Sequence, residues 1–348
     1  MRIDTFQIAR FRGIQSLALE GLSRVNMIVG ANNAGKTAVL EALQTFCYPG
    51  HITRDDWLPM HRLTDRSVKE AIETWGWLWY QRNLEAPIEL QALQGGLLDG
   101  KSIRRVMISV EDEPKGFRRQ QYLQMESPWD IRFSISEDGK PAGNVPVKVH
   151  AKGGVHHFTA PHSLVPLGVL TTERATDVVK LAQHWGTLDE TARQDQITAL
   201  LNKADPRIKR IQVKALSAAA ILQVDTGLNR YIPASFLGDG IQRLLRLSIG
   251  MAEAKGGVFL IDEMETGFHR SLLPTVWTFI KEAAKELDVQ VFATTHSWEA
   301  IASAHEVFEK DSKDLVLFRL ERDAENIKAV RIVNDQLARM VESGWEVR

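Results

Sequence analysis

Residues Gly30 to Thr37 read Gly-Ala-Asn-Asn-Ala-Gly-Lys-Thr, which matches the pattern G-x-x-x-x-G-K-[ST] at every defined position. The glycines of such a loop let the backbone curl until several N–H groups point at one anion, and the helix that follows adds its positive N-terminus. This chemistry favours binding of a nucleoside triphosphate such as ATP. Lys36 is predicted to reach the β- and γ-phosphates, and the Thr37 hydroxyl to ligate Mg²⁺. The predicted nucleotide-binding residues of the loop are Gly30, Asn32, Asn33, Ala34, Gly35, Lys36 and Thr37.

Two adjacent carboxylates, Asp262 and Glu263, follow the apolar run 257–261. An apolar run that ends in two acids is weak evidence alone, because many strands end at a solvated turn. Together with the phosphate loop the pattern becomes specific. Asp262 is predicted to complete the Mg²⁺ shell beside Thr37, and Glu263 to polarise a water for in-line attack on the γ-phosphate.

His296 stands at the end of a further apolar run, residues 289–295. In an open α/β sheet ligands bind at the carboxyl ends of the strands, so His296 is predicted to contact the γ-phosphate or the attacking water. Upstream, Gly238, Asp239 and Gly240 precede an amphipathic stretch over 241–254. Two glycines at a helix start make either an anion site or a simple turn with an N-cap, and spacing alone leaves both open.

The elements that must position these residues follow from hydrophobic periodicity. We expect an N-terminal hairpin feeding a buried strand over 2–29, an antiparallel layer over 103–158, and helices over 175–203, 241–254 and 271–287. The fold class is α/β with a mixed sheet, an antiparallel β layer and an inserted helical lobe. We predict one discontinuous domain over 1–348. Its nucleotide-binding core covers 1–60 and 215–348, and the inserted β layer and helical lobe cover 61–214.

An aromatic segment lies inside a predicted helix over 67–83 and reads Trp75-Gly76-Trp77-Leu78-Trp79-Tyr80. Clustered aromatics form either a patch for a partner or part of a core, and both alternatives stay open.

Composition narrows the class of protein. The chain has 348 residues, with 43 Lys and Arg against 44 Asp and Glu, so no global basic field attracts nucleic acid. Local basic clusters near 101–105, 118–119 and 207–210 keep contact with DNA or RNA open. The single cysteine, Cys47, excludes an internal disulfide framework and fits a reducing cytoplasm, where we expect it to pack inside a helix. No run of about 18 apolar residues occurs, so we expect no membrane span.

In this order the motifs resemble the ABC-type ATPases of the RecF, SMC and OLD (overcoming lysogenization defect) group, nearest the OLD-like ATPases of bacterial defence systems. The resemblance implies a head that dimerises face to face around ATP. It makes Gly238 to Gly240 a signature segment facing the partner's nucleotide, with Gly238 where the family has serine and Ser235 three residues earlier. It also makes Glu265 to His269 the D-loop, and Arg12 a nucleotide contact.

The resemblance also makes His296 the switch histidine, and full-length OLD proteins continue into a Toprim nuclease domain after that residue. About fifty residues follow His296 here, which is too short for another domain. The resemblance therefore implies an ATPase subunit that forms a homodimer or higher oligomer and gates a separately encoded effector, a Toprim or other nuclease, in antiphage defence. The alternatives are a nucleotide-dependent scaffold with little turnover, a RecF-like DNA repair ATPase and the ATPase subunit of a transporter.

Overall fold

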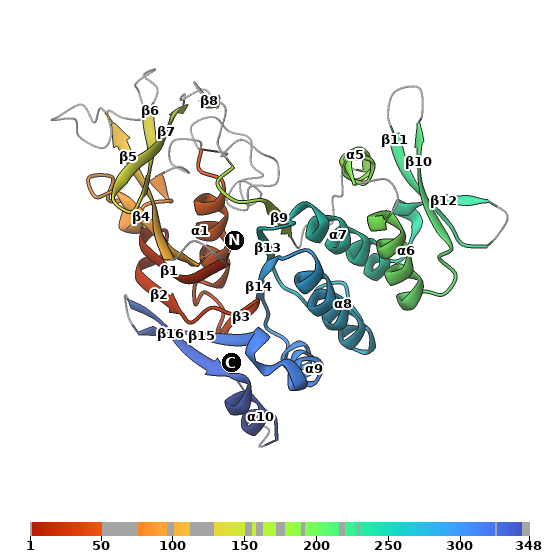
Figure 1. Cartoon of the computed structure of the whole chain (residues 1–348). Helices are drawn as coiled ribbons and strands as arrows, with labels where there is room; N and C mark the ends of the chain where they lie inside the picture. Colours follow the sequence, from red (N-terminus) through yellow and green to blue (C-terminus); the bar gives the residue numbers. More distant parts are fainter. Residues whose placement is uncertain are drawn as a thin grey trace.

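The structure is a computed structural model of the whole chain (Figure 1). The described residues are 2–50, 76–95, 101–111, 129–149, 155–157, 163–171, 178–188, 192–215, 220–227, 230–323 and 326–342. Two large sheets lie in this part of the chain, and helix α1 (Lys36–Cys47) packs between them, touching strands of both.

A six-stranded sheet forms the centre of the molecule, in the order β16-β15-β3-β14-β13-β9. Each strand runs parallel to its neighbours except β16, which is antiparallel to β15. Three of its strands are buried along their whole length, because helices or the second sheet cover both faces. The bounds are β3 Val25–Gly30, β9 Leu167–Leu170, β13 Val258–Ile261, β14 Gln290–Thr294, β15 Leu315–Asp323 and β16 Asn326–Val333.

The second sheet is antiparallel, with seven strands in the order β2-β1-β4-β5-β6-β7-β8. Alternation in β4 puts every other side chain in the core and leaves the rest half-exposed, as expected for a sheet with one solvated face. The bounds are β1 Arg2–Phe11, β2 Ile14–Glu20, β4 Ile88–Gly95, β5 Lys101–Glu111, β6 Trp129–Glu137, β7 Lys140–Val149 and β8 Val155–His157. The predicted hairpin and antiparallel layer are confirmed.

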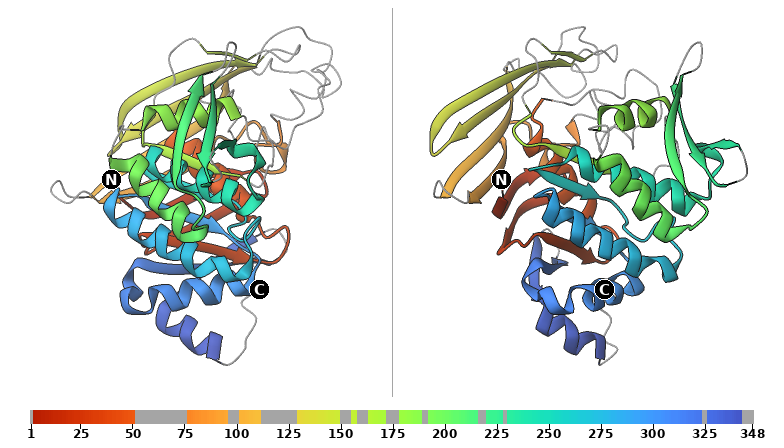
Figure 2. Two further views of the ribbon diagram at one scale, coloured as in Figure 1. Left: turned by 90° about the vertical axis from the view of Figure 1, so that its right-hand side faces the viewer. Right: turned by 45° about the vertical axis from the view of Figure 1, so that its right-hand side comes forward.

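The two faces of β3 contribute to two different cores. Met27 packs with residues of helices α8 and α9, whereas Ile28 packs with α1 and the antiparallel sheet. The helices beside the first face are α7 (Asp239–Glu253), α8 (Leu273–Glu286) and α9 (Trp298–Phe308), which Figure 2 shows from the side. Cys47 ends α1 and is buried, as predicted, and burial raises the pKa of its thiol to about 12.

A smaller lobe extends from α7, on the right of Figure 1. It consists of α5 (Val178–Thr187), α6 (Ala192–Ala204) and a three-stranded antiparallel sheet, β10 (Arg210–Ala215), β11 (Ala220–Asp225) and β12 (Tyr231–Pro233). This matches the predicted helical lobe. Every helix in the described part of the chain is too short or too polar to span a lipid bilayer.

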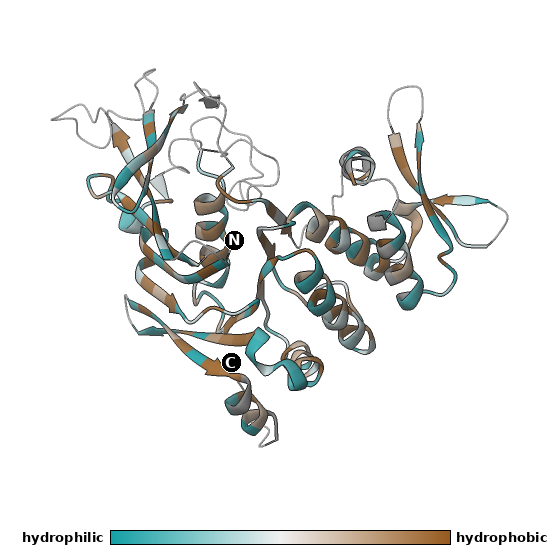
Figure 3. Cartoon of the chain, viewed as in Figure 1, coloured by the Kyte–Doolittle hydropathy of each residue, from teal (hydrophilic) through white to brown (hydrophobic). Residues whose placement is uncertain are grey.

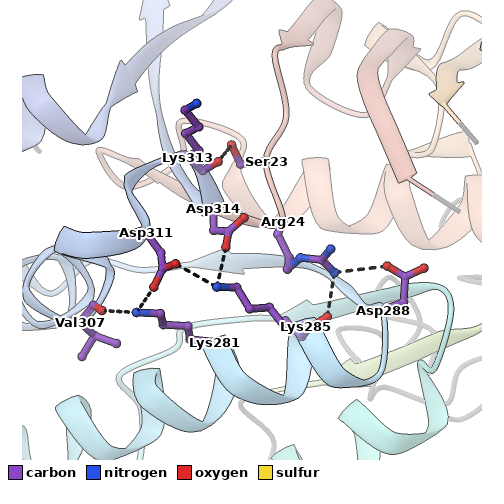
Figure 4. A network of polar contacts seen from close by, with 10 residues as sticks. Ser23, Arg24, Lys281, Lys285, Asp288, Val307, Asp311, Lys313 and Asp314 are labelled. Atoms are coloured by element: carbon purple, nitrogen blue, oxygen red, sulfur yellow. Dashed lines mark hydrogen bonds and ion pairs between the residues drawn. The ribbon is translucent and has the colours of Figure 1, made fainter. Parts of the chain in front are cut away.

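Short helices and ion pairs complete the C-terminal side. Lys285 on α8 reaches both Asp311 and Asp314 of the 3-10 helix η4 (Glu309–Asp314), and Lys281 also pairs with Asp311 (Figure 4). Figure 3 shows the polar character of this segment against the hydrophobic central strands. The remaining elements are η1 (Tyr80–Arg82), η2 (Ala234–Phe236), η3 (Arg270–Leu272) and α10 (Asn334–Glu342).

The structure differs from the predictions in the aromatic segment. Residues 51–75 lie outside the described part. In the described remainder of the predicted helix over 67–83, Gly76 is helical, but a turn follows at once and leads into 3-10 helix η1. A backbone bridge between Phe11 and Trp79 holds this segment against β1, which an α-helix would prevent.

Sheet membership also departs from the predicted division into core and insert. Strand β9 lies within 61–214 but pairs in parallel with β13 of the central sheet. The N-terminal hairpin, predicted as core, forms two strands of the antiparallel sheet. The division at residues 61 and 215 therefore does not follow the sheets, because strand partners are chosen across long sequence separations.

Gly168 provides a test of how closely β9 packs on α7. A Cβ at this position would lie 2.2 Å from the Gly250 carbonyl oxygen and 2.9 Å from the Phe259 ring. We expect Gly168→Ala to lower the free energy of unfolding by about 1–3 kcal/mol, because backbone cannot move aside as a flexible side chain can. Urea unfolding followed by circular dichroism measures this.

The matched control is Gly186→Ala in α5, where an added Cβ meets no atom of the described residues within 4 Å. It should raise the free energy of unfolding by about 0.4–1 kcal/mol. Equal effects of the two substitutions would contradict the close approach of β9 and α7.

Candidate active site

The phosphate loop leaves β3 through a backbone that needs glycine at two points. Gly30 has φ +143°, and a Cβ there would lie 2.6 Å from the Leu320 carbonyl oxygen of β15. Gly35 has φ +100° and caps α1 without a hydrogen bond from any side chain of the described residues. The first turn of α1 carries no acidic residue, so its N-terminal amides are suited to an anion.

Lys36 is the first residue of α1 and is nearly buried. Its ammonium donates to the carbonyl oxygens of Gly30 at 2.7 Å and Ala31 at 2.9 Å, so it lies inside the curve of the loop. Burial lowers the pKa of Lys36, and three nearby carboxylates, chiefly that of Asp262, partly oppose this effect. The ammonium is thus held where a bound phosphate chain would meet it.

Asp262 follows β13 and meets the phosphate loop, as the motif spacing predicts. Its Oδ1 lies 3.5 Å from the Thr37 hydroxyl and accepts a hydrogen bond from the Thr294 hydroxyl at 2.7 Å. The backbone N–H of Asp262 donates to the Leu170 carbonyl oxygen of β9 at 2.9 Å. The carboxylate is therefore oriented from β14, while its backbone is fixed by β9.

Glu263 has φ +48°, a backbone conformation that non-glycine residues adopt rarely and that clusters at active sites as well as in turns. Its N–H donates to the same Thr294 hydroxyl at 2.8 Å, and its carboxylate accepts from the Thr266 hydroxyl at 3.0 Å. Thr294 thus bonds both acidic residues. Thr294 was not among the predicted site residues, although it lies in the run before His296.

Arg243 is a second residue at this site that was not predicted from the sequence. This buried side chain on α7 donates to the carbonyl oxygens of Thr171 at 3.0 Å, Asp262 at 3.0 Å and Glu263 at 2.8 Å. Burial lowers the pKa of Arg243 to about 10. The guanidinium links α7, which begins within the predicted signature, to the backbone of Asp262 and Glu263.

Glu265 connects the acidic segment to the predicted switch. Its carboxylate accepts hydrogen bonds from the Thr295 hydroxyl at 2.7 Å and from the His296 N–H at 2.8 Å. The backbone at His296 is therefore held relative to the segment that carries Glu263.

A cavity of about 780 Å³ opens over the loop, a volume within the usual range for ligand pockets. Predicted site residues on its wall are Arg12, Asn32, Asn33, Gly35, Lys36, Thr37, Glu263 and His296. Unpredicted ones are Gly13, Ala38, Trp77, Trp79, Tyr80, Gln81 and Arg322. Gly30, Ala34 and Asp262 do not line it: the first two build the loop, and the third lies behind Thr37.

Arg12 follows β1 with φ +53° and forms an ion pair with the buried Glu41 of α1. Its guanidinium therefore forms part of the cavity wall while being anchored to the helix after the phosphate loop.

The structure does not bring the predicted signature to this cavity. Gly238 caps α7, and its carbonyl accepts from the N–H groups of Ile241 and Gln242. Gly238, Asp239 and Gly240 are absent from the lining residues, while Phe236 just before them is 80% exposed. The structure therefore has the predicted N-cap at Gly238. The alternative, an anion site at this helix start, stays a prediction.

The donors near the loop fit a magnesium ion that shares its shell with phosphate. A hydroxyl and a carboxylate, those of Thr37 and Asp262, lie close together, and Mg²⁺ commonly takes one or two protein oxygens plus waters and phosphates. Among the described residues no cluster of three or more His, Cys, Asp or Glu could hold a metal without such help.

Four basic residues of the predicted clusters at 101–105 and 207–210 already have partners within the chain. Lys101 pairs with Asp4, Arg104 with Glu137 and Arg207 with Asp205. Arg105 donates to the Gln91 amide oxygen. The cluster at residues 118–119 lies outside the described residues.

Two family models match the chain on either side of the cavity. Residues 179–302 match the family described as "AAA domain, putative AbiEii toxin, Type IV TA system", and residues 1–74 match a family described as "AAA domain". The first range contains Asp262, Glu263 and His296, and the second contains the phosphate loop. The matches therefore fall on the two segments that meet at the Thr37 hydroxyl.

A similar curated protein is an ATP/GTP phosphatase of Helicobacter pylori, 24% identical over 92% of this chain and 93% of its own. Among solved structures, an SMC head bound to the C-terminal winged-helix domain of ScpA covers 97% of this chain and 100% of that chain, with 12% identity and a TM-score of 0.61. The SMC head of Thermotoga maritima covers 95% and 99%, with 12% identity and a TM-score of 0.51.

These findings show an ABC-type P-loop ATPase head fold, as the resemblance predicted. They also support the broad resemblance to ABC and SMC-like P-loop ATPases. The narrower placement among OLD-like ATPases stays a prediction.

Thr294 provides a test of this geometry. Thr294→Val keeps the shape of the side chain but removes the donor to Asp262 and the acceptor for the Glu263 N–H. We expect the free energy of unfolding to fall by about 1–3 kcal/mol, because buried polar groups lose their partners. Urea unfolding measures this. Thr278→Val on α8, where the hydroxyl only bonds its own helix, is the control and should change little; an equal loss in the control would refute the bridging role of Thr294.

Proposed function

We propose that this chain binds ATP with Mg²⁺ and hydrolyses it to ADP and phosphate. The observation that carries the proposal is the approach of Thr37 to Asp262, 3.5 Å between oxygens, with Glu263 and His296 on the wall of the same cavity. Two segments far apart in the chain thereby come together, one with the phosphate cradle and the other with Asp262 beside Thr37 and Glu263 on the cavity wall. The similar ATP/GTP phosphatase and the two AAA-type family models support this activity.

Lys36 and the N-terminal amides of α1 hold the triphosphate. The ammonium exchanges its hydrogen bonds to the Gly30 and Ala31 carbonyls for phosphate oxygens, and the loop backbone is already curved for this. A bound polyphosphate adds negative charge beside Lys36, which raises its pKa and offsets the effect of burial.

Thr37 and Asp262 are the residues that would hold Mg²⁺. The ion supplies charge neutralisation on the β- and γ-phosphate oxygens when it is bound. Thr294 keeps the Asp262 carboxylate turned toward Thr37, so the donor set is arranged before any ligand arrives.

Glu263 acts as the general base. Water attacks the γ-phosphorus, the bond from that phosphorus to the β,γ-bridging oxygen breaks, and ADP leaves with the bonding electrons, while the water proton moves to the Glu263 carboxylate. The constrained backbone of Glu263 and the donor from Thr266 fix where that carboxylate lies. His296 donates to the γ-phosphate or orients the water.

Two substitutions separate binding from hydrolysis. Lys36→Ala should abolish ATP binding, because it removes the cation from the cradle. Glu263→Gln should bind ATP normally but hydrolyse it at least about 100-fold more slowly, since proton transfer contributes about 10²–10⁴-fold. Calorimetry measures binding, and phosphate release measures turnover. Normal turnover in Glu263→Gln would refute the role of the base, and negligible turnover in the unaltered protein would favour a nucleotide-dependent scaffold.

We propose further that ATP closes a homodimer in which the signature segment of one chain meets the nucleotide of the other. The support is that this segment is missing from the cavity of its own chain while Phe236 beside it is exposed. Arg243 on the same helix donates to the backbone carbonyl oxygens of Asp262 and Glu263. A contact at the signature segment would therefore affect the position of these two acidic residues. The dimer then gates a separately encoded effector, a nuclease in our proposal, and the toxin described for one matched family supports a role in defence.

Gly238 offers a test of the dimer. It has an ordinary φ of −59°, and an added Cβ meets nothing of the described residues within 4 Å. Gly238→Trp should therefore fold and bind ATP, yet lose ATP-dependent dimerisation, because the indole fills the proposed contact surface. Light scattering with Glu263→Gln as background detects the dimer. Gly186→Trp is the control; a dimer that persists in Gly238→Trp would contradict the interface.

A further inference from the structure

The aromatic turn over residues 77–80 has no part in the chemistry proposed so far, yet it lines the cavity above the phosphate loop. Trp77, Trp79 and Tyr80 all contribute to the wall. The side of the wall formed by the phosphate loop is polar and cationic, as phosphate requires. The aromatic turn supplies the three aromatic rings of the lining.

The position of this turn is fixed relative to the loop. The Arg12 N–H donates to the Leu78 carbonyl oxygen at 2.6 Å, and Trp79 forms a backbone bridge with Phe11. Leu78 and Trp79 are buried, so the turn is anchored in the core under the antiparallel sheet. Trp77 is thus presented from a rigid base.

Trp77 itself is 60% exposed, although an indole is among the largest apolar side chains. The Arg82 guanidinium lies over the ring at 5.0 Å from its centroid, which covers one face. The exposure leaves room for a flat group on the remaining ring surface. An indole backed by a guanidinium and open to a cavity is a platform for a planar heterocycle.

Trp79, on the same wall, carries a hydrogen-bond donor left unsatisfied by the described residues. Its indole Nε1 is buried and has no hydrogen-bond acceptor among the described residues, while the same side chain lines the cavity. A buried donor without an acceptor is costly, and a ligand with acceptor atoms beside the turn would remove that cost.

We propose that Trp77 stacks on the nucleobase of the bound nucleotide and so sets the affinity for nucleosides over bare polyphosphate. This inference rests on the proposed function, because it needs the triphosphate to occupy the loop. Stacking on an indole accepts any base with a π face, so adenine and guanine nucleotides both gain from it.

The experiment compares nucleotides with a ligand that has no base. Calorimetry with Mg²⁺ measures the Kd of ATP, of GTP and of inorganic tripolyphosphate for the unaltered protein, Trp77→Ala and Trp77→Phe. We expect Trp77→Ala to raise the Kd of ATP and GTP by about 5- to 100-fold and to leave tripolyphosphate unchanged. Trp77→Phe should restore most of the loss, since a ring remains.

Tyr231→Ala serves as the control, because this aromatic lies on β12 away from the cavity lining. It should leave all three Kd values unchanged. Circular dichroism checks that each variant is folded.

Each other outcome overturns the proposal. Unchanged nucleotide binding in Trp77→Ala, while Lys36→Ala abolishes it, would overturn the stacking role and leave the proposed function standing. Equal weakening of tripolyphosphate and nucleotides would show that Trp77 acts only through the shape of the loop. No binding of any of the three ligands by the unaltered protein would overturn both proposals.

Discussion

The carboxylate of Asp262 is the point on which the arrangement of the site depends. It must stay close to Thr37 for a phosphate chain and a cation to be shared, yet a buried carboxylate needs hydrogen bonds to offset its lost hydration. The Thr294 hydroxyl on the neighbouring strand donates one such hydrogen bond. Arg243 holds the backbone of Asp262 by donating to its carbonyl oxygen. Because β3, β14 and β13 are parallel, the phosphate loop, Thr294 and Asp262 all lie at the carboxyl ends of these strands.

The position of the phosphate loop at the carboxyl end of β3 also explains why α1 lies between two sheets. The helix must begin where β3 ends, and its apolar side chains, among them Leu40 and Phe46, are then covered by the antiparallel sheet. Phe46 meets Phe6 of β1 edge to face at 5.5 Å. The second sheet thus supports the helix whose N-terminus faces the cavity, and it carries Arg12 and the aromatic turn to the same place.

The parts of the site that follow from local chemistry were predictable, because the glycines, Lys36 and the acidic pair need fixed spacing beside strands. Their convergence was predictable too, since parallel strands end at a common edge. Arg243 was not, because its acceptors are backbone carbonyls that no side-chain type reveals. The aromatic turn was misjudged as helix because pairing with Phe11 overrode its local periodicity. Strand β9 lies inside the predicted insert although it belongs to the central sheet, because its partner β13 lies far along the chain.

The pairing of β3 has a consequence for biosynthesis. This strand precedes the phosphate loop, but both of its neighbours, β14 and β15, come from the last part of the chain. The hairpin of β1 and β2 closes early, whereas β3 has no sheet to join until the ribosome has made most of the protein. Until then an apolar strand and a glycine-rich loop emerge uncovered, so nascent chains are exposed to aggregation and to chaperones for most of translation. The chain can therefore bind a triphosphate only after most of it has been synthesised.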